Sequence, residues 1–144
     1  MKPNPKLQPF EALIGSWSLV GSHPQIPNTT LRGRATFEWI EGGAFCRMHM
    51  EIDEPQIPTG IAIFGSDDEG PRFYMIYFDE RGVSRKFDVT LRDDGCEWTR
   101  MAPGFSQRFS ISVAPDGRRM EGKGILSKDG RSWEGDLQLT YTRA

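Results

Sequence analysis

Short alternating segments separated by tight turns are the feature of this sequence that most constrains its fold. Ten of them follow one another after Gly15, each bounded by glycine, proline, aspartate or asparagine. Apolar and polar residues alternate along several segments, which is the period of a strand with one buried face and one solvated face. The connections are too short for crossover helices, so consecutive strands are expected to pair antiparallel. The predicted strands span residues 17–22, 31–40, 44–52, 59–65, 71–78, 83–91, 96–101, 105–113, 118–126 and 133–143.

The alternation assigns an inner face most clearly in three of these strands. The expected inward residues are Val83, Phe87, Val89 and Leu91; Phe105, Phe109, Ile111 and Val113; and Trp133, Leu137, Leu139 and Tyr141. In the strand at 71–78 the register depends on the following turn. A four-residue turn at 79–82 would direct Tyr74, Ile76 and Phe78 inward, whereas a shift of one residue would direct Tyr77 inward instead.

The sheet is expected to close into a ring, because closure pairs its two edge strands with each other. An open meander of ten strands would leave two unpaired edge strands, so we predict an all-β fold, a ten-stranded antiparallel up-and-down β-barrel forming one domain over residues 1–144. Residues 1–8 are expected to form an extended arm. A short helix at 9–14, ended by Gly15, would cap one end of the barrel. A last strand paired with the first would place the Arg143 guanidinium over the Trp17 indole.

The turns divide between the two ends of such a barrel. One end, here called the floor, receives the helix and polar glycine-containing turns. The other end, here called the mouth, receives two loops that repeat the string Pro-Gln-Ile-Pro, at 24–27 and 55–58. These loops are long and stiff, and each carries an isoleucine, Ile26 or Ile57, expected to be exposed. We therefore expect them to line an opening.

The sequence also resembles known β-barrel families. Gly15-Ser16-Trp17 after a short helix and the closing Arg143 resemble the calycins and lipocalins, and Ile14–Val20 resembles the opening of the fatty-acid-binding proteins. Almost the whole chain resembles an uncharacterised family of bacterial lipocalin-like domains, through Trp39–Phe45, Phe78–Gly82 and Ser127–Trp133. The resemblance implies a barrel with an internal cavity. It implies no activity, and the chain lacks the two helices that follow the first strand in fatty-acid-binding proteins.

Composition excludes several classes of function. The net charge of −2 is spread along the chain, so we expect no nucleic-acid partner and no binding to a membrane surface. The apolar runs are far shorter than the roughly 20 residues of a membrane helix. The polar, proline-rich start does not resemble a signal peptide, which predicts a cytoplasmic protein in which Cys46 and Cys96 are free thiols.

The candidate ligand site consists of polar residues at positions where the strand alternation predicts an inward-facing side chain. Arg85, Arg100 and Gln107 lie on adjacent predicted strands toward the mouth, and Tyr77 joins them in one of the two registers. Guanidinium and amide groups around an apolar cavity suit a carboxylate or phosphate head group. The alternative is that the arginines extend to the rim and reach solvent. The expected walls, which in the alternative view fill a solid core, are Trp39, Met48, Met50, Phe87 and Trp98.

Neither histidine has the setting of a metal or haem ligand. His49 lies on the polar face of its strand and His23 in a loop, and no cysteine or histidine cluster has zinc spacing, so we expect no metal and no cofactor. No catalytic motif is present. The sequence predicts non-catalytic binding of a small, largely apolar or amphipathic molecule, with an anionic head group in one version. Two alternatives stay open: a small-molecule enzyme on the same barrel, and a homodimerising interaction domain that uses Ile26 and Ile57.

Overall fold

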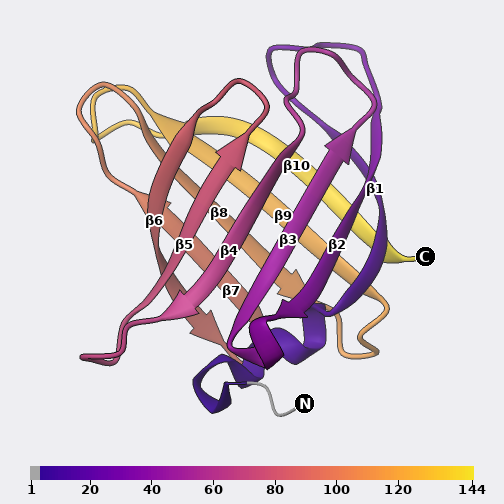
Figure 1. Cartoon of the computed structure of the whole chain (residues 1–144). Helices are drawn as coiled ribbons and strands as arrows, with labels where there is room; N and C mark the ends of the chain where they lie inside the picture. Colours follow the sequence, from indigo (N-terminus) through magenta and orange to yellow (C-terminus); the bar gives the residue numbers. More distant parts are fainter. Residues whose placement is uncertain (1–3) are drawn as a thin grey trace.

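The chain forms a closed barrel of ten strands, as predicted (Figure 1). The computed structural model describes residues 4–144. Each strand pairs antiparallel with the next, and β1 pairs with β10 to complete the ring. The predicted boundaries are correct to within one or two residues. The strands are β1 (Gly15–Ser22), β2 (Leu31–Ile40), β3 (Phe45–Ile52), β4 (Gly60–Ser66), β5 (Phe73–Asp79), β6 (Ser84–Arg92), β7 (Gly95–Arg100), β8 (Ser106–Val113), β9 (Arg119–Ser127) and β10 (Glu134–Arg143).

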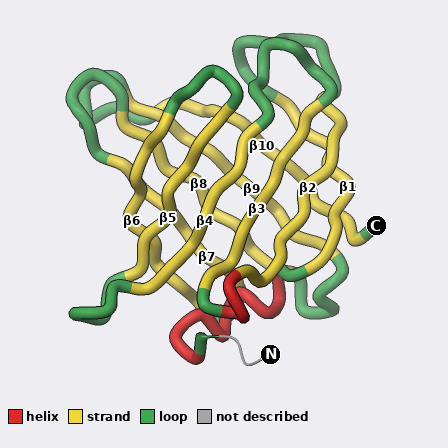
Figure 2. Tube along the Cα trace, in the orientation of Figure 1, coloured by secondary structure: helices red, strands yellow, loops and turns green. Residues whose placement is uncertain are grey.

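The helical plug of the floor begins earlier than predicted (Figure 2). It is a 3₁₀-helix, η1 (Pro5–Leu13), and the second short turn, η2 (Glu41–Gly43), lies beside it. The Asn4 side chain accepts a hydrogen bond from the Lys6 backbone N–H at 3.0 Å, and Leu7 is fully buried. Residues 5–8 therefore do not form the predicted extended arm, because they have their own cap and contribute to the core. Asn4 is the cap of this helix, and residues 1–3 of the predicted arm lie outside the described residues.

Arg143 closes the floor as predicted. It pairs with Trp17 across the β1–β10 seam, and its guanidinium carbon lies 4.2 Å from the centre of the indole ring. The guanidinium also donates hydrogen bonds to the carbonyl oxygens of Ile14 (2.7 Å), Ala12 (3.0 Å) and Gly117 (3.0 Å). One side chain thus joins the last strand to the first strand, the end of η1 and the β8–β9 turn.

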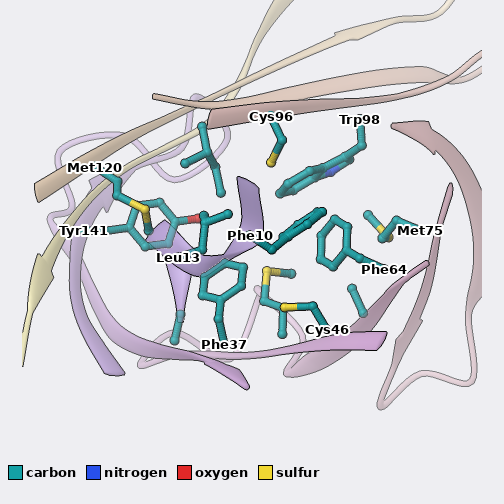
Figure 3. Packing of buried hydrophobic residues seen from close by; sticks show 14 of the residues in the cluster. Phe10, Leu13, Phe37, Cys46, Phe64, Met75, Cys96, Trp98, Met120 and Tyr141 are labelled. Atoms are coloured by element: carbon teal, nitrogen blue, oxygen red, sulfur yellow. The ribbon is translucent and has the colours of Figure 1, made fainter. Parts of the chain in front are cut away.

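The floor half of the barrel is a solid apolar core (Figure 3). Phe10 of η1 packs on Phe64 of β4 with ring centres 4.8 Å apart, and Phe64 in turn packs on Trp98 of β7 at 5.5 Å. Cys46 and Cys96 are free and buried here, as predicted, and their burial raises the pKa of each thiol to about 12. In the floor half, therefore, the side chains fill a solid core and do not surround a cavity.

The β5–β6 turn settles the register that the sequence left open. The Asp79 N–H donates to the Val83 carbonyl at 3.1 Å, which leaves a three-residue loop ending at Gly82, where φ is +81°. The four-residue alternative is therefore wrong and the shifted register is correct. Tyr77 lies opposite Arg85 and lines the interior, whereas Phe78 is 38% exposed.

A β-bulge in β10 changes the inner face at the start of that strand. The pairing with β9 shifts by one residue between Gly135 and Gln138. Asp136, which regular alternation with Leu137 and Leu139 would place on the outer face, consequently lines the interior together with Leu137. Trp133 was expected inside, and that expectation is wrong. It packs against Arg108, with the guanidinium carbon 4.9 Å from the ring centre.

Candidate ligand-binding site

The mouth half of the barrel contains a cavity of about 390 Å³. This volume lies within the range of about 300–1,000 Å³ typical of small-molecule sites. The cavity is lined by His23, Gln25, Gln56 and Ile57 of the loops opposite η1, so it lies at that end of the barrel. These loops are at the top of Figure 1. The predicted assignment of mouth and floor therefore matches the geometry.

The base of the cavity is aromatic. Trp98 and Phe109, on adjacent strands β7 and β8, stack with ring centres 5.0 Å apart and an interplanar angle of 21°. Trp98 also touches Phe64 of the solid core, so it lies at the boundary between the two halves. A side chain at Gly122 of β9 would meet Phe109 at 2.7 Å, so the glycine makes room for that ring. The remaining apolar wall is formed by Met48, Met50, Met75, Phe87, Leu126, Leu137 and Tyr141.

Arg85 and Gln107, two of the polar residues predicted to face the cavity, contact each other. The Arg85 Nη1 donates to the Gln107 Oε1 at 3.2 Å, and both residues line the cavity. The Arg85 guanidinium also lies 5.5 Å from the centre of the Phe105 ring. Among residues 4–144, Arg85 has no carboxylate within ion-pair distance. Its remaining N–H groups are therefore available to a ligand in the cavity.

Seven of the nine predicted site residues line the cavity, and Trp39 and Arg100 do not. Trp39 lies near the end of β2 that meets the floor, where its Nε1 donates to the Glu11 Oε2 at 3.3 Å. Arg100 is at the mouth, but its Nη1 donates to the Phe105 carbonyl of the β7–β8 turn at 3.5 Å. The two-arginine clamp is thus reduced to one arginine on the cavity wall.

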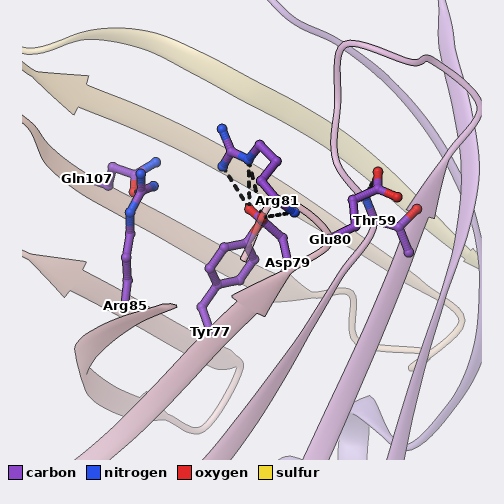
Figure 4. A network of polar contacts seen from close by, with 7 residues as sticks. All are labelled: Thr59, Tyr77, Asp79, Glu80, Arg81, Arg85 and Gln107. Carbon is purple, nitrogen blue, oxygen red and sulfur yellow. Dashed lines mark hydrogen bonds and ion pairs between the residues drawn. The ribbon is translucent and has the colours of Figure 1, made fainter. Parts of the chain in front are cut away.

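A second polar network, around Asp79, lies beside the first (Figure 4). The fully buried Asp79 carboxylate accepts hydrogen bonds from the Tyr77 hydroxyl (2.7 Å) and from Arg81 (2.7 Å to Nη2). The Arg81 guanidinium holds the pKa of Asp79 well below its usual range, while burial and the Asp79 carboxylate raise that of Tyr77. Asp79 therefore stays ionised and fixes Arg81 at the edge of the cavity.

His23 and Asp136 form a third polar pair that sequence reasoning missed. The His23 Nε2 lies 2.9 Å from the Asp136 Oδ1, with the side chains 20% and 18% exposed. The His23 Nδ1 accepts the Gln25 backbone N–H at 3.1 Å, so the ring proton belongs on Nε2, the nitrogen that faces Asp136. His49, as expected, lies on the outer face near Glu51. No local signal in the sequence indicates this pair, because Asp136 faces inward only through the bulge.

The two Pro-Gln-Ile-Pro loops adopt matching turns. In each, the residue before the first proline accepts two hydrogen bonds: its carbonyl from the isoleucine N–H (both 3.0 Å), and its side chain from the glutamine N–H. His23 has this position in the first loop and Glu54 in the second. Ile26 and Ile57 were expected to be exposed, but both are partly buried against the core because the turns fold them inward.

The described residues add two negative findings. Residues 4–144 contain no group of three or more histidine, cysteine, aspartate or glutamate side chains placed to hold a metal ion. No helix in that part of the chain has the length and apolar character needed to span a bilayer.

Comparisons with known proteins establish the fold. No family model matches the chain, and no curated protein matches its sequence. The crystal structure of Rv2717c from M. tuberculosis is similar with a TM-score of 0.70, over 99% of each chain, at 15% identity. The S-type phycobiliprotein lyase CPES from Guillardia theta is similar with a TM-score of 0.58, over 94% of this chain and 90% of that chain, at 12% identity.

These likenesses and the closed ring define the protein as a ten-stranded β-barrel of lipocalin-like fold. Membership in the bacterial lipocalin-like family, which the sequence resembles, stays a prediction because no family model matches.

Proposed function

We propose that this protein binds a small, largely apolar molecule with an anionic group inside the mouth half of its barrel. The observation that carries the proposal is an aromatic and methionine-lined cavity of about 390 Å³ that holds Arg85, a guanidinium with no carboxylate partner among residues 4–144. A partly buried cation loses hydration, so an anionic ligand that restores its hydrogen bonds is favoured over a neutral one. Similarity to a barrel described as a phycobiliprotein lyase supports a small-molecule role for the interior.

Binding without catalysis is the version that the geometry favours. His23 is the histidine that lines the cavity within residues 4–144; its Nδ1 already accepts the Gln25 N–H, and its Nε2 lies 2.9 Å from the Asp136 carboxylate. The Tyr77 hydroxyl donates a hydrogen bond to Asp79, and its raised pKa keeps it protonated. Neither group is arranged to take a proton from a ligand.

The test compares two fluorescent probes with the same aromatic skeleton, the anion anilinonaphthalenesulfonate and the uncharged N-phenylnaphthylamine. Both are expected to bind, and Arg85→Met is expected to weaken the anion about tenfold while leaving the uncharged probe unchanged. Arg100→Met is the matched control, since Arg100 shares the inner parity and the mouth position but does not line the cavity.

Two results would contradict the proposal. If neither probe binds to the folded protein, the cavity is not a ligand site. If the anion binds equally well to wild type and Arg85→Met, its head group is not recognised by Arg85.

A further inference from the structure

Asp136 places a negative charge in the cavity that no side chain of the described residues neutralises. Its contact there is the His23 Nε2, which lies 2.9 Å from one carboxylate oxygen, while the His23 Nδ1 accepts the Gln25 N–H, an arrangement in which the imidazole ring carries no charge. The other oxygen has no hydrogen-bond donor within residues 4–144. A partly buried carboxylate with one neutral donor is under-satisfied, because carboxylates accept several hydrogen bonds.

The other charged residues around the cavity are already paired. Arg81 is bound to Asp79 at 2.7 Å. Arg108 lies near Glu97 at 3.6 Å and against the Trp133 ring. This leaves Arg85 and Asp136 as the cation and the anion of the cavity that lack an opposite charge.

Arg85 and Asp136 form no ion pair with each other within residues 4–144, and they lie on separated strands. Arg85 is on β6 and Asp136 on β10, four strands apart in the ring of ten. Gln107, to which Arg85 extends, is on β8, two strands from β10, which corresponds to roughly 10 Å at ~4.8 Å per strand. The stacked Trp98 and Phe109 rings form the base of the cavity between these groups.

From this arrangement we infer that the ligand is zwitterionic: a compact aromatic or alicyclic body with an acidic group at one end, for Arg85 and Gln107, and an ammonium group at the other, for Asp136. This inference rests on the proposed function and adds a second point of recognition to it. The carboxylate of Asp136 would exchange water for a charged donor, and the ring would lie on the aromatic base.

The test uses three rigid ligands in calorimetric titrations. Para-(aminomethyl)benzoate carries both charges, para-ethylbenzoate replaces the ammonium with a methyl group, and para-methylbenzylamine lacks the carboxylate. The zwitterion is expected to bind about tenfold tighter than either counterpart. Asp136→Asn should remove this advantage without weakening para-ethylbenzoate. Glu134→Gln is the control, since Glu134 is a neighbouring acid on β10 that is exposed and does not line the cavity.

The outcomes separate the inference from the proposed function. If the zwitterion binds no tighter than para-ethylbenzoate, while Arg85→Met still weakens para-ethylbenzoate, the inference is wrong and the anion site stands. If Arg85→Met weakens neither acid, the proposed function is wrong as well. Thermal unfolding of Asp136→Asn checks its fold, and if that variant is unfolded, the three affinities for the wild-type protein still decide.

Discussion

The floor half of the barrel is filled by side chains, whereas the mouth half, built from the same ten strands, leaves a cavity of about 390 Å³. The difference comes from what covers each end. η1 inserts Leu7, Phe10 and Leu13, each no more than 1% exposed, into the floor. The mouth loops instead place turns with half-buried isoleucines, Ile26 and Ile57, around an opening. Stability is therefore expected to reside in the floor and recognition in the mouth.

The largest expected effect is on stability at the floor. Phe10→Ala should lower the free energy of unfolding by about 4 kcal/mol, because it removes a fully buried ring that packs on Phe64. Ile57→Ala at the mouth is the control, with an expected loss of about 1 kcal/mol for a half-buried side chain. Urea unfolding measures both. Equal losses would show that the two ends contribute alike.

A smaller effect concerns acid stability at the mouth. Asp79 has a pKa below its ordinary value of 3.8, so its ionised form adds stability above that pH, and this stability is lost as the pH falls through the lower folded value. Asp79→Asn should therefore be less stable than wild type at neutral pH, and the difference should shrink in acid.

Urea unfolding from neutral pH down to about pH 2 checks this expectation. Asp68→Asn, an exposed turn residue at the floor end, is the control. A difference between Asp79→Asn and wild type that stays constant with pH would show that the Asp79 charge is not what stabilises the turn.

Arg85→Met is expected to have the smallest effect on stability, although it should have the largest effect on ligand binding. Arg85→Met should change the free energy of unfolding by no more than about 0.5 kcal/mol, because the half-buried guanidinium has one hydrogen bond to Gln107 and no ion pair within residues 4–144. Thermal and urea unfolding measure it. A loss comparable to that of Phe10→Ala would make Arg85 a structural residue and would contradict the division between the two ends.

The fold was predictable because its signals are local. Alternation, turn residues and the need to pair edge strands gave the ten strands, and closure gave the contact of Arg143 with Trp17. The candidate site was predictable only in part. The alternation of inward and outward residues correctly predicted that Arg85 and Gln107 line the cavity. Alternation does not show where the end of a long side chain lies, so it wrongly predicted that Arg100 lines the cavity as well.

The remaining errors arose where strand pairing departs from regular alternation. The β5 register depends on whether Val83 or Ser84 is the first residue after the turn to bond to β5. The two registers differ there by a single hydrogen bond. The inward position of Asp136 depends on a bulge in β10, which appears only when β10 is paired with β9. Neither is encoded in the residues of a single strand, so the His23–Asp136 pair could not be seen before the strands were assembled.

The seam between β1 and β10 has a consequence for how the protein is made. Trp17 and Arg143 are paired neighbours in space, yet nearly the whole chain separates them in synthesis. A nascent chain on the ribosome therefore carries two bare strand edges until Arg143 has emerged, and only then can the ring shut. Until then, those unpaired edges are the surfaces at which the incomplete chain is most open to pairing with another chain.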